Sequence, residues 1–172
     1  MAGFTLIELM IVVAIVAILA AVVVPSFFRE AQKTKGAAEV GPMFAELATR
    51  QEAYKVENGV YLSTSAAEGT TFPAATTGTT AQDLTASPPA TWAALKVQPP
   101  VAMARCVYVS MAGAGGDASN IGAQGTAFGF TAPGVAWYYL LARCDLDNDS
   151  GVDSWYFQSS VDPTLRKLNP GH

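Results

Sequence analysis

Residues 3–25 read GFTLIELMIVVAIVAILAAVVVP, and this stretch decides the fold of the 172-residue chain. Within residues 4–24 every side chain except those of Thr5 and Glu8 is apolar. At a rise of ~1.5 Å per residue this segment reaches ~30 Å as a helix, about the thickness of a hydrocarbon core. Apolar side chains face every direction of such a helix, as in helices surrounded by lipid or by other apolar helices. We therefore predict a membrane-spanning helix that contains one carboxylate.

This segment differs from a cleavable secretory signal. Such a signal has a positively charged beginning, a shorter apolar stretch and an exit of small residues, whereas here VVVPSFF follows the apolar run. We therefore expect the helix to be retained. Arg29, Lys33 and Lys35 follow the span, and by the positive-inside rule they would place the rest of the chain in the cytoplasm.

Two cysteines argue for the opposite orientation. Cys106 and Cys144 lie in strand-like segments, and an even number of cysteines in an exported domain favours a disulfide. The alternative is a pair of free, buried thiols. If the disulfide forms, we expect it to contribute roughly 3–4 kcal/mol by the chain-entropy model.

Residues 4–28 form the predicted membrane and assembly segment. Over residues 29–58 the pattern of apolar residues becomes that of an amphipathic helix. Pro25 and Pro42 fall inside this continuous pattern, and each removes one backbone hydrogen bond and crowds the preceding turn, so we expect kinks there. Asn58 and Gly59 are expected to end this helix. The apolar positions of the second segment are Val40, Phe44, Leu47 and Tyr54.

Residues 59–172 have the composition of a small head. Residues 62–100 are rich in Ser, Thr, Ala, Gly and Pro and predict a long surface loop, in which Trp92 and Leu95 anchor a short turn of helix. Strand signals follow at 104–111, 135–144 and 154–160, with a possible fourth strand in TLRKL. The glycine-rich residues 112–125 are interpreted as a flexible connection. The predicted fold is α+β, a long kinked N-terminal helix packed on a small antiparallel sheet.

Composition argues against two classes of function. The formal net charge is −4 and no basic patch follows Lys35 except LRK at residues 165–167, so we expect no specific nucleic-acid contact. The single histidine is His172, and no serine lies in a nucleophile-elbow motif, so we expect no enzyme activity.

The acidic stretch DLDNDSGVD, residues 145–153, is the one candidate metal site. Alternating carboxylates suit a hard cation such as calcium, which takes six to eight oxygen ligands. The pattern departs from an EF-hand loop, because Ser150 stands where glycine is needed and Tyr156 where glutamate is needed. A solvated acidic turn is therefore the alternative, and no other cofactor is expected. The candidate ligands are Asp145, Asp147, Asp149 and Asp153.

The segment GFTLIELMIVVAIVAILAAVVVPSFF resembles the N-terminal segment of type IV pilins and type II secretion pseudopilins, and ATRQEAYKVENGVY resembles the end of their long helix. The resemblance implies cleavage between Gly3 and Phe4 by a prepilin peptidase, with residues 1–3 as the remnant of a leader. It also implies N-methylation of Phe4 and assembly into a filament from the bacterial inner membrane.

Cleavage before Phe4 creates a cationic α-amino group, and Glu8 lies one helical turn away. In a filament, the amine of one subunit can face Glu8 of its neighbour, so that Glu8 fixes the register of otherwise featureless apolar helices. We predict a structural subunit of a type IV pilus, partnered by other pilin subunits and the assembly machinery, that ends in an extracellular pilus. The alternatives are a pseudopilin of a periplasmic pseudopilus and a low-abundance minor pilin that acts as a tip adhesin or binds DNA.

Overall fold

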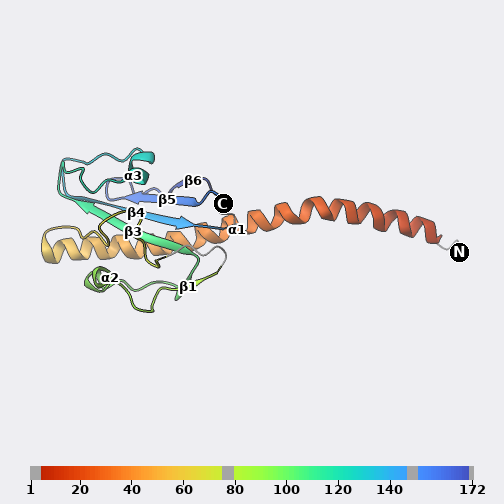
Figure 1. Cartoon of the computed structure of the whole chain (residues 1–172), viewed down its shortest axis with the longest axis horizontal. Coiled ribbons are helices and arrows are strands. Elements are labelled where there is room, and N and C mark those ends of the chain that lie inside the picture. Colours follow the sequence, from red (N-terminus) through yellow and green to blue (C-terminus); the bar gives the residue numbers. More distant parts are fainter. Residues whose placement is uncertain (1–4, 75–79, 147–150, 171–172) are drawn as a thin grey trace.

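The computed structural model describes residues 5–74, 80–146 and 151–170. A helix, α1 (Leu6–Asn58), extends far beyond a small head that is built on its second half (Figure 1). Thr5 caps the beginning of α1, and Gly59, with a left-handed φ of 79°, ends it by donating its N–H to the carbonyl of Lys55. The helix continues through Pro25 and Pro42, so neither proline ends it, while kinks at these two positions stay a prediction.

The first half of α1 has no cover. Residues Leu6–Val24 have a mean hydropathy of 3.1, and none of them is buried within the chain. The large apolar side chains in this range are between 48 and 79% exposed. In the described part of the chain, this is the one helix long and apolar enough to cross a membrane. Such a surface requires lipid or other protein around it, because exposed apolar area is unfavourable in water.

The second half of α1 is amphipathic and buries one stripe on the head. Val40, Met43, Phe44 and Leu47 are fully buried at spacings of three, one and three residues, which is the helical repeat. Gln51 continues the stripe as a buried polar residue. The predicted core positions of this segment are therefore confirmed, except that Tyr54 is only partly buried.

The main sheet is an antiparallel meander of four strands in the order β3-β4-β5-β6. The three predicted strands and the possible fourth are all present. Their bounds are β3 Cys106–Gly113, β4 Trp137–Cys144, β5 Ser154–Ser159 and β6 Arg166–Leu168. The sequence did not predict a second sheet of two short strands, β1 (Gln82–Asp83) and β2 (Met103–Ala104).

Both faces of the central strands are covered, which explains why β3 and β4 are apolar almost throughout instead of alternating. One face packs on α1 through Tyr108, Leu140 and Tyr156. The other face carries Val109, Met111, Trp137, Tyr139, Leu141 and Phe157, packed under Phe128 and Phe130. The aromatic residues of the strands are therefore mostly core and form no exposed stacking surface.

Two loop predictions need correction. The glycine-rich residues 112–125 lead into a short helix, α3 (Ala123–Ala127), and the following Phe128 is buried, so this connection is a packed cover of the sheet. Residues 62–100 contain the predicted short helix, α2 (Ala90–Leu95), but they are more than a surface excursion. Glu68 and Leu84 are buried, and Phe72 makes an antiparallel bridge to Tyr108 that covers the edge of β3.

Candidate functional site

The exposed beginning of α1 holds the candidate assembly residue, Glu8. Its Oε2 accepts hydrogen bonds from the Thr5 hydroxyl at 2.7 Å and from the Thr5 backbone N–H at 2.9 Å. The Thr5 hydroxyl oxygen in turn accepts from the backbone N–H of Glu8 at 3.3 Å. This reciprocal arrangement is a capping box, in which each residue satisfies a backbone donor that the first turn of a helix leaves free.

The carboxylate of Glu8 therefore has a partner in its own chain, Thr5, in addition to the predicted pairing with a neighbouring subunit. The signal was present in the sequence, because Thr5 and Glu8 stand three residues apart as in the pattern Ser/Thr-x-x-Glu. Thr5 was overlooked as a functional residue. The predicted processing residues Gly3 and Phe4 lie outside the described residues, so cleavage and methylation at this position stay predictions.

A second constellation fixes α1 where it leaves the head. One carboxylate oxygen of Glu39 accepts hydrogen bonds from the backbone N–H of Cys106 at 2.9 Å and from the Tyr108 hydroxyl at 2.9 Å. The backbone N–H of Arg105 contacts both oxygens at 3.0 Å. Burial, reinforced by the Glu39 charge, raises the pKa of Tyr108 far above its ordinary value, so this hydroxyl remains a donor. The helix is thus pinned to the first residues of β3.

The predicted disulfide lies at the same end of the sheet. Cys106 and Cys144 are bonded, with an S–S distance of 2.02 Å, and both are buried. They are direct cross-strand partners of β3 and β4, which brings their Cα atoms to 4.3 Å. The disulfide prediction is therefore confirmed, and the alternative of two free thiols is wrong.

A polar clamp holds the far end of α1. The buried Gln51 donates from Nε2 to the Leu62 carbonyl at 2.6 Å and to the Ser110 hydroxyl at 2.8 Å. Its Oε1 accepts from the Leu62 N–H at 3.0 Å. One amide side chain thereby joins the helix, the chain that follows it and the middle of β3, which makes the head and the second half of α1 one unit.

Glu68 forms the least expected polar site of the head. This carboxylate is 8% exposed and accepts from the Tyr139 hydroxyl at 2.6 Å and from the N–H groups of Gly125 and Gln124 at 2.8 and 2.9 Å. A Cβ on Gly122 would come within 2.2 Å of its Oε2. All three partners donate, as an ionised carboxylate requires. Glu68 therefore closes the loop after α1 over the cover of the sheet, and no local motif in the sequence indicated this.

Of the four candidate calcium ligands, Asp145 and Asp153 belong to the described chain, whereas Asp147 and Asp149 lie outside it. The Asp153 carboxylate faces the Arg143 guanidinium, with an Nε–Oδ2 distance of 3.8 Å. Arg143 thus supplies one positive charge at this loop. Within residues 5–74, 80–146 and 151–170, no group of three or more acidic, histidine or cysteine side chains lies close enough together to hold a metal ion. Calcium binding by this loop stays a prediction.

The geometry defines the class of protein: an α+β chain in which one apolar helix is exposed along its first half and fixed to a small antiparallel sheet along its second. Residues 1–24 match the prokaryotic N-terminal methylation motif. The type IV wide pilus major component PilA4 of Thermus thermophilus is 45% identical over 65 residues, which is 38% of this chain and about half, 49%, of that relative. No solved structure matches the chain significantly. Together with this fold, the motif and the relative support the type IV pilin family as the family of this chain.

Proposed function

We propose that the protein is a structural subunit of a type IV pilus and that it polymerises through the first half of α1. The observation that carries the proposal is the contrast along one helix, since Leu6–Val24 is wholly unburied whereas the stripe from Val40 onward is fully buried. A soluble monomer would leave this apolar surface in water. Lipid can cover it before assembly and the helices of other copies can cover it afterwards. The pilus relative supports this assignment.

In this proposal the chain is inserted in the bacterial inner membrane, a prepilin peptidase cleaves it before Phe4, and the assembly machinery moves it into an extracellular filament. The α-amino group of Phe4 then faces Glu8 of a neighbouring subunit. Glu8 is already ordered by Thr5 in the isolated chain, so its carboxylate is oriented before the neighbour arrives. Since an apolar helix slides past another with little preference, a single charge pair sets the register.

The test compares Glu8→Ala with Thr5→Val in the producing organism. Three properties are measured for each variant: membrane insertion, the mass of the processed N-terminal peptide, and the yield of sheared filaments seen by electron microscopy. We expect Glu8→Ala to insert and fold but to yield few filaments, because the partner of the amine is lost. Thr5→Val removes the capping hydroxyl and keeps the carboxylate, and we expect it to assemble well above the Glu8→Ala level.

Normal filament yield from Glu8→Ala would refute the register argument. Equal loss in both variants would assign Glu8 to helix capping alone. Glu52→Ala, which removes an exposed carboxylate from the same helix, serves as the control for a general charge effect. Filaments that remain in the periplasm in the unmodified strain would refute the pilus assignment and favour a secretion pseudopilus.

A further inference from the structure

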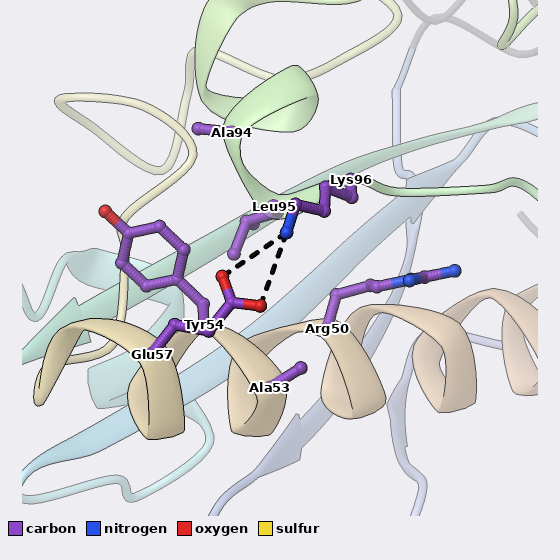
Figure 2. A pocket seen from close by; sticks show the side chains of 7 residues that line it. All are labelled: Arg50, Ala53, Tyr54, Glu57, Ala94, Leu95 and Lys96. Carbon is purple, nitrogen blue, oxygen red and sulfur yellow. Dashed lines mark hydrogen bonds and ion pairs between the residues drawn. The ribbon is translucent and has the colours of Figure 1, made fainter.

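The last turns of α1 and the end of α2 enclose a small polar pocket that the proposed function does not use. Its volume is about 160 Å³ (Figure 2). Arg50, Tyr54 and Glu57 line it from α1, and Leu95 and Lys96 line it from the end of α2. A single water needs only about 10–15 Å³ of such space, so the pocket is larger than a one-water site. Its size and its polar lining suit a compact, polar ligand.

The pocket presents donors and acceptors side by side, and each of its two cationic side chains has a carboxylate partner. Lys96 Nζ lies 3.3 Å from both carboxylate oxygens of Glu57, and Arg50 Nε lies 2.7 Å from Glu46 Oε1. In Figure 2 the Tyr54 ring stands on one side of the Glu57–Lys96 pair and the Arg50 side chain on the other. Lys96 is paired with Glu57, the one carboxylate of the lining, and Arg50 is paired with Glu46, which does not line the pocket. A free ion of either sign would therefore have to compete with an existing ion pair. The balance favours a neutral ligand with several hydroxyl groups.

Lys96 is held in an unfavourable backbone conformation. Its φ is 56° and its ψ is 38°, the left-handed region that ends a helix and that glycine usually occupies. A lysine at this position costs free energy that the exposed ion pair with Glu57 recovers only in small part, because exposed pairs contribute little. Strained residues of this kind occur preferentially at ligand sites. Here the strain positions an ammonium group at the mouth of the pocket.

We propose that this pocket binds one neutral sugar unit. A sugar hydroxyl can donate to Glu57 and accept from Lys96 at the same time, and the Tyr54 ring offers an apolar face beside them. The pair remains open to ligand, since the side chains of Lys96 and Glu57 are 66 and 58% exposed. The head of the subunit would then carry a carbohydrate site distinct from the assembly helix.

The test measures saturation-transfer NMR of sugars with the full chain in zwitterionic micelles that contain no sugar headgroup. The panel consists of glucose, galactose and N-acetylglucosamine, a trisaccharide of the strongest of them, and glucuronate and inorganic phosphate as charged probes. We expect a signal from at least one neutral sugar and weaker signals from both charged probes. Binding of the trisaccharide through its terminal unit alone identifies a chain end as the source, and equal binding of the monosaccharide identifies a free sugar.

Two variants separate binding from folding. Lys96→Gly relieves the left-handed backbone and removes the ammonium, so we expect the melting temperature to stay or rise while binding weakens about tenfold or more. Asn169→Gly relieves a φ of 50° outside the pocket and should leave binding unchanged. The proposal is wrong if no neutral sugar gives a signal, if phosphate or glucuronate binds best, or if Lys96→Gly and Glu57→Gln both bind as the unmodified chain does. None of these outcomes bears on filament assembly, so the proposed function is tested separately.

Discussion

Replacing the buried carboxylate of Glu68 with an amide should destabilise the head although it changes almost no volume. In Glu68→Gln, one side-chain oxygen becomes an NH2 group that has to face a backbone N–H, either that of Gln124 or that of Gly125. One buried donor is then left without an acceptor, which costs about 1–3 kcal/mol. The remaining bonds, including the 2.6 Å bond from Tyr139, lose the contribution of the charge. We expect the free energy of unfolding to decrease by about 2–4 kcal/mol in total, because the two effects act together.

The assay is thermal unfolding of the full chain in micelles, followed by tryptophan fluorescence. Trp137 is a suitable reporter, because it is fully buried and its indole N–H donates to the Asp117 carbonyl in the cover of the sheet. A loss of this size corresponds to a decrease in melting temperature of roughly 8–16 °C. Glu52→Gln is the matched control, since Glu52 also accepts from a tyrosine hydroxyl, that of Tyr61 at 2.9 Å, but is exposed.

We expect the free energy of unfolding of the Glu52→Gln control to decrease by less than about 1 kcal/mol. If Glu68→Gln and Glu52→Gln melt at the same temperature, the burial argument is refuted. If Glu68→Gln alone melts lower but Tyr139→Phe has no effect, the backbone donors and not the tyrosine carry the stabilisation.

Three further predictions concern the head. The double variant Cys106→Ser with Cys144→Ser should lose roughly 3–4 kcal/mol of unfolding free energy, and reductant should lower the melting temperature of the unmodified chain but leave that of the variant unchanged. Burial raises the pKa of Tyr138 to about 12, so the folded head binds more protons than the unfolded chain above pH ~10, where tyrosine ordinarily ionises. Its stability should therefore decrease as the pH rises from 10 to 12, with tyrosinate absorbance appearing together with unfolding; ionisation well before unfolding would contradict this. If the acidic loop binds calcium, ligand at ~100 times its dissociation constant should add about 2.7 kcal/mol, and equal melting temperatures in calcium and chelator would exclude such a site.

The sequence was sufficient to predict the parts of the fold that local periodicity determines. Three features predicted the bounds of α1 close to those observed: the apolar run, the stripe that begins at Val40 and the glycine after Asn58. The β-branched and aromatic runs predicted β3, β4 and β5, because strands buried on both faces have few polar positions. The strands β1 and β2 were missed, since two residues are too few for any period to appear.

The polar contacts that hold the head together were not predictable in the same way. Glu39, Gln51 and Glu68 each bond groups that are at least eleven residues away, and nothing near them in the sequence marks the partner. Glu39 and Glu68 were indistinguishable from surface carboxylates, as helix-face and loop glutamates usually are. The capping box of Thr5 and Glu8 was different, because its two members stand three residues apart. The prediction for Glu8 considered only a pairing with a neighbouring subunit and did not include this local pattern.

The position of the disulfide has a mechanical consequence. If the chain polymerises through its helices as proposed, tension runs along α1. A pull on a head then enters it where the helix leaves the sheet, beside the contact of Glu39 with Cys106. At that end β3 would be peeled from β4 one hydrogen bond at a time, starting with the outermost pair. Cys106 and Cys144 are that outermost pair. The covalent bond therefore prevents peeling from starting there, and a force must shear several strand hydrogen bonds together before the sheet opens.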